Sequence, residues 1–308
     1  MLRPGSVVTR ASHVFVVGLP RTGTTLTRNV LNRSPLVGLG GESHFFGSRG
    51  RLGLTGRTGY RERFARLGDL RTEEGLRRIV DAIFASSGKS YWARLARTAD
   101  RAEFERLLRA SDRTERALFD TAMAVVAAGK PIRGEKTPHH IEVVPTLLEW
   151  FPEARVVHTF RDPRAVYVSL RRKERAEALS PLGRAARRLG PAFDAYSIVN
   201  VGLAWRRVAA LHRAYAARYP GRYLLVRFED LVTAPEPTIR RICEFVGIEF
   251  VPEMLDQTVF NSSYLPRDGA SGFDRSAVRR WERHLGPLGR RAFRLLCGAE
   301  LHAFGYPD

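Results

Sequence analysis

Two hydrophobic patterns alternate along the chain. Short apolar runs are typical of buried strands, and they lie at 13–19, 36–39, 154–160 and 223–228. A further short strand is predicted at 132–136. Apolar positions with helical spacing lie at 26–31, 72–86, 102–110, 113–128, 139–150, 165–172, 198–219 and 237–246, and two basic helices end the chain. Strands that alternate with helices predict an α/β fold, with a mostly parallel central sheet flanked by helices on both faces.

The length of the chain and its lack of linker-like segments predict its domain organisation. At 308 residues and 44% hydrophobic content the chain is long enough to bury a large core. It contains no internal repeat, low-complexity tract or clear linker, so we predict one domain over residues 1–308. The Gly- and Arg-rich stretch 47–59 has no apolar period and is predicted to be a loop, either a lid or a plain surface insertion.

The composition indicates which kinds of partner and which compartment suit the protein. The formal charge of +19 favours an acidic partner, but 47 of the 51 basic residues are arginines, a skew that codon usage alone can produce. No apolar run reaches the roughly 18 to 20 residues that span a bilayer, and no signal peptide is evident, which predicts a soluble, cytoplasmic protein. Cys243 and Cys297 stand singly in helical patterns and are predicted to be buried thiols.

A phosphate-binding loop follows the first predicted strand. In the segment GLPRTGTT, Gly18 and Gly23 stand five positions apart between a strand and a helix. Backbone N–H groups in such a loop can surround an anion at the helix start. The lysine of a nucleotide-kinase loop is missing, because Thr24 occupies its position, and Arg21 is placed to supply positive charge instead.

This loop resembles the 5′-phosphosulfate loop of the sulfotransferases that use 3′-phosphoadenosine 5′-phosphosulfate (PAPS). The likeness is greatest to the branch with tyrosylprotein sulfotransferases and related bacterial enzymes. It implies a P-loop-containing fold in which five residues bind the 5′ phosphosulfate: Arg21, Thr22, Gly23, Thr24 and Thr25. The family more often has serine at the position of Thr22, and the hydroxyl is retained.

A second anion site is predicted in the segment RDPRAVYVSLRRK. Arg161 ends a predicted strand, Ser169 follows eight residues later, and Lys173 lies one helical turn beyond Ser169. In the family pattern, arginine and serine at this spacing hold the 3′ phosphate of the donor, and a third basic residue can join them. The resemblance therefore implies this role for Arg161, Ser169 and Lys173. The alternative is a charged strand-to-helix corner followed by a solvated helix face.

The resemblance extends through residues 223–247, where Phe228 stands in place of the family's tyrosine. Core packing is the expected role of this ring, with stacking on adenine as the alternative. Beyond residue 250 the resemblance ends. Three arginines of that region are candidates to close over the donor: Arg275, Arg279 and Arg280.

The catalytic groups are expected after two further strands. The resemblance makes Glu42 the general base and assigns Lys136 to the leaving oxygen. Other sulfotransferases use histidine as the base, and three histidines lie in these segments: His44, His139 and His140. The alternative to catalysis is a salt-bridging or helix-capping carboxylate at Glu42 and an ion pair between Lys136 and Glu135.

The sequence thus predicts a sulfotransferase that takes PAPS as donor, releases 3′,5′-ADP (PAP) and acts on an acceptor hydroxyl without a metal. Residues 47–128 are expected to shape the acceptor site, and sugars, glycolipids, tyrosine and small alcohols or phenols all remain open. A P-loop kinase or nucleotide hydrolase is the first alternative and would need the missing lysine. A nucleic-acid-binding protein is the second, and it rests on net charge alone.

Overall fold

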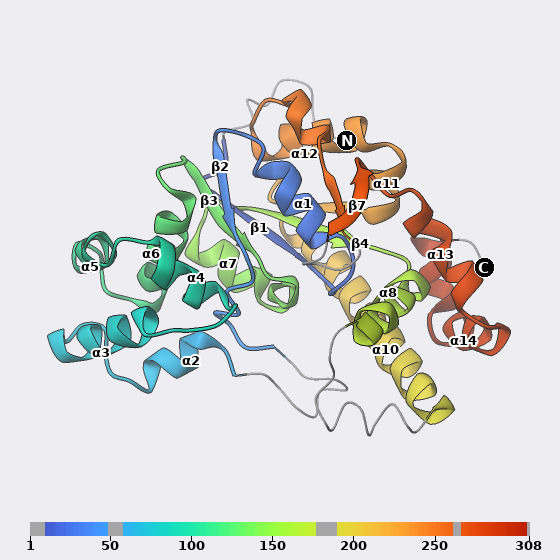
Figure 1. The fold of residues 1–308 in the computed structure, drawn as a ribbon, viewed down its shortest axis with the longest axis horizontal. Helices are drawn as coiled ribbons and strands as arrows, with labels where there is room; N and C mark the ends of the chain where they lie inside the picture. The colour runs from blue at the N-terminus through green and yellow to red at the C-terminus, as the bar shows by residue number, and fades with distance from the viewer. Residues whose placement is uncertain (1–9, 49–57, 177–189, 261–265, 307–308) are drawn as a thin grey trace.

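A five-stranded parallel sheet forms the centre of the computed structural model, which describes residues 10–48, 58–176, 190–260 and 266–306 (Figure 1). The strand order is β2-β3-β1-β4-β5, and every neighbouring pair runs parallel. The strands are β1 (His13–Gly18), β2 (Val37–Gly40), β3 (Ile132–Lys136), β4 (Arg155–Phe160) and β5 (Tyr223–Arg227). The predicted α/β class and the five predicted strands are confirmed.

Helices cover both faces of the sheet, which is why a strand such as β1 has apolar residues at successive positions. On β1, Val14 and Val16 join the cluster formed with α1 (Thr24–Leu31) and α12 (Pro235–Val246). Phe15, between them, points to the opposite face and packs on Phe119 of α6 (Glu115–Ala127). The cluster on that face also contains residues of α7 (Val144–Trp150) and α10 (Pro191–Arg218).

A helical insertion separates β2 from β3. It comprises α2 (Tyr60–Ala65), α3 (Glu73–Phe84), α4 (Tyr91–Thr98), α5 (Arg101–Arg109) and α6. Four of these helices begin at a side chain that accepts a hydrogen bond from a backbone N–H of the first turn, and the capping residues are Thr72, Ser90, Asp100 and Thr114. The short helices α2 and α4 were not predicted. The predicted loop 47–59 lies mostly outside the described residues.

The second half of the chain brings four differences from the prediction. The helix expected at 139–150 is a 3-10 helix, Pro138–Val143, followed by α7. Helix α8 (Pro163–Ala176) begins earlier than expected because its first residue is a proline. A short helix, α11 (Phe228–Thr233), follows β5, and a hairpin of β6 (Thr258–Phe260) and β7 (Pro266–Ser271) precedes α13 (Ser276–His284) and α14 (Pro287–Ala303).

Two expectations from composition can be compared with the structure. Cys243 and Cys297 are both free and buried, as predicted. None of the helices in the described ranges is long and apolar enough to cross a membrane.

Candidate active site

The loop between β1 and α1 is held by its own backbone and by one buried hydroxyl. Gly23 caps α1 with φ of 95°, and Arg21 also has a positive φ, of 76°. The hydroxyl of Thr22 donates to the carbonyl of Leu19 at 2.7 Å and shares a hydrogen bond with the hydroxyl of Thr159 at 2.8 Å. The Thr22 hydroxyl therefore points into the protein, and Thr22 does not line the cavity described below.

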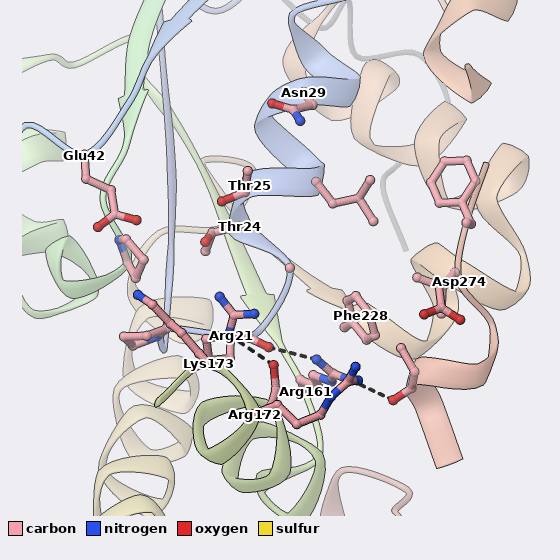
Figure 2. A pocket seen from close by; sticks show the side chains of 18 of the residues that line it. Arg21, Thr24, Thr25, Asn29, Glu42, Arg161, Arg172, Lys173, Phe228 and Asp274 are labelled. Carbon is pink, nitrogen blue, oxygen red and sulfur yellow. Dashed lines mark hydrogen bonds between the residues drawn. The ribbon is translucent and has the colours of Figure 1, made fainter. Parts of the chain in front are cut away.

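A cavity of about 390 Å³ opens in front of this loop. Nine of the predicted site residues line it: Arg21, Gly23, Thr24, Thr25, Glu42, His44, Arg161, Ser169 and Lys173. Thr22 and Lys136 do not line it directly. In Figure 2, Glu42 lies on one side of the loop, and Phe228 and Asp274 lie on the other. The phosphate-binding loop, the second predicted anion site and the predicted catalytic residue Glu42 therefore all face one cavity.

The two predicted anion sites share contacts. Arg21 Nε donates to Ser169 Oγ at 3.1 Å, although the two residues are 148 positions apart. Arg161 Nη1 donates to the carbonyl of Arg21 at 3.0 Å (Figure 2), and Nη2 donates to the carbonyl of Ala277 in α13 at 2.7 Å. The N-terminal loop, the end of β4 and helix α8 therefore form one continuous basic surface.

Arg161 is a buried cation of this surface. Its side chain is enclosed, and its guanidinium lies 4.0 Å from the centre of the Phe228 ring. Burial lowers the pKa of Arg161 to about 10, and the nearby Glu229 carboxylate only partly offsets that effect. Its Nε has no hydrogen-bond partner although it is buried. A buried, incompletely satisfied guanidinium at a cavity wall is suited to receive an anion.

Glu42 and Lys136 form a close ion pair at the other side of the cavity. The distance from Lys136 Nζ to Glu42 Oε1 is 2.5 Å, and His44 Nε2 lies 3.4 Å from Glu42 Oε2. Burial opposes ionisation of Glu42, but the hydrogen bond from His44 and the charge of Lys136 outweigh it and hold its pKa well below the usual range. Glu42 is therefore a carboxylate at neutral pH. Burial also lowers the pKa of Lys136, despite the opposing charge of Glu42.

Glu135 is occupied elsewhere, so it is not the partner of Lys136. Successive side chains of a strand point to opposite faces, and Glu135 pairs with His140 Nδ1 at 2.5 Å on the far side of β3. It also accepts from the backbone N–H of Ser43 at 3.1 Å and from Thr137 Oγ1 at 2.9 Å. His140 is fully buried in this network, away from the cavity, whereas His44 and His139 both line it.

Several lining residues were not predicted from the sequence: Asn29, Arg172, Phe273 and Asp274. Phe228, expected in the core, lines the cavity as well as packing on Arg161. Of the three C-terminal arginines, only Arg280 lines the cavity, where it donates to Asp274 Oδ2 at 2.5 Å. Arg279 pairs with Glu282 at 2.7 Å on an exposed face, and Arg275 is exposed.

The fold and the cavity define a class of protein: a P-loop-type α/β protein with two basic sites on one cavity. The sequence model of the sulfotransferase family matches residues 13–252, which covers the sheet and both sites, and the chain belongs to the sulfotransferase family. The sulfotransferase domain of the olefin synthase from Synechococcus PCC 7002 has the same fold, with a TM-score of 0.56, 20% identity and 99% of both chains covered.

Curated relatives share shorter stretches. Carbohydrate sulfotransferase 7 of Mus musculus is 28% identical over 205 residues, which cover 54% of this chain and 42% of the relative. The omega-hydroxy-beta-dihydromenaquinone-9 sulfotransferase of Mycobacterium bovis is 31% identical over 113 residues, which cover 37% of this chain and 28% of the relative. The chain therefore spans less than half the length of these two relatives.

Proposed function

We propose that the protein transfers the sulfuryl group of PAPS to an acceptor hydroxyl and releases 3′,5′-ADP. The observation that carries the proposal is the joining of two anion sites on one cavity by the contact between Arg21 and Ser169. A donor with one phosphate at each end of its ribose needs two such sites. An ordinary adenine nucleotide would use only the first.

The loop residues would hold the 5′ end of the donor. Arg21, Gly23, Thr24 and Thr25 face the cavity at the start of α1, where backbone N–H groups and hydroxyls favour an anion. Arg161, Ser169 and Lys173 would hold the 3′ phosphate. Charge-assisted hydrogen bonds of this kind contribute about 1.5 to 3 kcal/mol each.

Glu42 is proposed as the general base. Its carboxylate is ionised and faces the cavity, so it can accept the proton of an acceptor hydroxyl. The acceptor oxygen then bonds to sulfur while the bond from sulfur to the phosphate oxygen breaks. Lys136 would stabilise the negative charge that develops on this leaving oxygen. His44, which also contacts Glu42, is the alternative base.

The competing functions are less well supported. A kinase or nucleotide hydrolase would need a lysine where Thr24 starts α1. A nucleic-acid-binding role rests on net charge, and many arginines are paired with carboxylates on the same surface, as Arg61 is with Glu115 and Arg101 with Asp81. The acceptor is a hydroxyl compound, and we favour a sugar or a lipid-linked hydroxyl because carbohydrate and lipid-quinone sulfotransferases are among the relatives.

Calorimetric binding tests the donor assignment. We expect 3′,5′-ADP to bind in metal-free buffer at least about tenfold more tightly than 5′-AMP or ATP, because only it engages both sites. Ser169→Ala should reduce that preference and have a smaller effect on the affinity for 5′-AMP, because Ser169 also contacts Arg21 of the first site. Arg161→Ala should do so more strongly. Preference for ATP, or an equal affinity for 5′-AMP and 3′,5′-ADP, would contradict the proposal.

A further inference from the structure

The large apolar side chains that the described surface exposes gather on two helices. They are Tyr196, Val199 and Leu203 of α10 and Leu288 and Leu295 of α14. Leu288 is 85% exposed and Leu295 is 79% exposed. A single exposed leucine is common on soluble proteins, but a group confined to two helices marks an interaction surface.

Helices α10 and α14 pack side by side, at the lower right in Figure 1. Gly289 lies against Ile198, and Gly202 lies against Leu296. Further along, Arg206 pairs with Glu300 at 3.3 Å. Because residue numbers rise together along this contact line, the two helices run parallel.

The exposed side chains flank that line on its solvent side. Trp205 and Cys297 are buried on the core side of the line. Helical periodicity of about 3.6 residues per turn therefore places Val199, Leu203 and Leu295 on the opposite side of the contact. They form one apolar strip over both helices, and Leu288 extends it by two turns of α14.

The rim of this strip is positively charged. Arg283 of α13 and Arg291 and Arg294 of α14 are exposed. The single acidic residue of α14 is Glu300, and Arg206 already neutralises it. The strip therefore combines protruding leucines with Arg291 and Arg294, two exposed arginines of a helix whose one carboxylate is already paired.

We propose that this face of α10 and α14 docks on an anionic lipid surface. Leucines of an interfacial helix can enter the boundary between headgroups and acyl chains, while arginines bind the phosphates. The formal charge of +19 adds attraction at longer range. A second copy of the chain fits less well, because a two-fold contact would bring the same arginines face to face. The inference does not depend on the proposed sulfuryl transfer.

Flotation of the full chain with lipid vesicles tests the apolar part of this surface. We expect binding to vesicles of phosphatidylcholine mixed with phosphatidylglycerol, and much weaker binding to phosphatidylcholine alone. The double variant Leu288→Ser, Leu295→Ser should bind the mixed vesicles at least about tenfold more weakly, because two exposed leucines no longer enter the lipid. Its melting temperature should not fall, because both side chains face solvent.

A matched pair of variants tests the location of the charge. Arg291→Ala with Arg294→Ala removes two charges from the strip, and Arg77→Ala with Arg94→Ala removes two exposed charges from α3 and α4, at the opposite side in Figure 1. We expect only the first pair to weaken binding to the mixed vesicles. Equal weakening by both pairs, or unchanged binding by the leucine variant, would overturn the proposal. The proposal would also be overturned if the protein did not bind vesicles but formed a dimer that dissociates in the leucine variant.

Discussion

Lys136 donates a hydrogen bond to Glu42 across 2.5 Å, although the two residues are 94 positions apart. The pairing of β2 with β3 produces this contact, because it sets Gly40 opposite Glu135 in parallel register. Lys136 is the last residue of β3, and Glu42 follows the end of β2 by two residues, so both lie at the same edge of the sheet. The sheet register, rather than any local motif, therefore brings a carboxylate and an ammonium together at the cavity.

Glu42→Gln should abolish turnover and leave the donor site intact. The amide keeps the shape of the side chain but cannot accept a proton, so kcat should fall by about 10²- to 10⁴-fold. Affinity for 3′,5′-ADP should stay within about threefold, because the loop and Arg161 are unchanged. Steady-state kinetics and calorimetry on the same preparation measure both values.

His44→Gln is the control for this assignment. Removing the imidazole relieves one of the interactions that lower the pKa of Glu42, but it leaves the carboxylate and Lys136 in place. Activity should persist at a reduced level. If Glu42→Gln keeps wild-type turnover and His44→Gln loses it, the base is His44.

The alkaline limit of activity should reflect Lys136. Burial lowers its pKa in the free enzyme, so the ammonium loses its proton as the pH rises through a value below the usual lysine pKa of about 10.4. We expect kcat/KM to fall in that range. In Lys136→Arg the side chain stays protonated, so the alkaline decline should move to higher pH even if the maximum is lower. If the activity of Lys136→Arg declines at the same pH as that of the wild type, a group other than Lys136 causes the decline.

The sequence predicted the parts of the molecule that have strong local patterns. Strands β1, β4 and β5 are apolar runs, and Gly18 and Gly23 mark the loop by their spacing between a strand and a helix. The resemblance to sulfotransferases added Glu42 and Lys136, which are not close in the chain. Helices α2 and α11 were missed because six residues carry little periodicity.

The sequence does not reveal the position of a side chain when that position depends on contacts with residues far away in the chain. One partner of the Thr22 hydroxyl is Thr159, 137 positions away, so the sequence alone does not show that this hydroxyl points into the protein. Asp274 and Arg280 line the cavity and follow the hairpin β6–β7, whose second strand is the polar segment PRDGAS. Polar strands of this kind have no apolar alternation that would reveal them.

Thr22→Val should destabilise the protein rather than remove a donor contact. The substitution removes the hydrogen bond to the Leu19 carbonyl and the buried hydrogen bond shared with the Thr159 hydroxyl, which costs about 1 to 3 kcal/mol of unfolding free energy. Thr22→Ser keeps the hydroxyl and should cost less than about 1 kcal/mol. Urea denaturation measures both. A Thr22→Val variant with wild-type stability and no affinity for 3′,5′-ADP would show instead that the Thr22 hydroxyl binds the donor.

Gly23→Ala should be costly because of the Phe228 ring. A Cβ at this position would lie 2.6 Å from Phe228 Cδ2, and the backbone φ of 95° is already unfavourable for alanine. Gly129→Ala is the matched control, since Gly129 has φ of 80° but nothing within 4 Å of the added Cβ. We expect the control to lose about 1 kcal/mol of unfolding free energy, and Gly23→Ala to lose more.

The double variant Gly23→Ala, Phe228→Ala separates the clash from the backbone strain. Removing the ring should reduce the cost of the alanine to that of the Gly129 control, as measured by urea denaturation in a double-mutant cycle. Phe228→Ala alone also removes the ring that lies 4.0 Å from the Arg161 guanidinium, so it should weaken 3′,5′-ADP binding. Equal costs for Gly23→Ala and Gly129→Ala would mean that the ring moves aside freely and does not fix the position of Arg161.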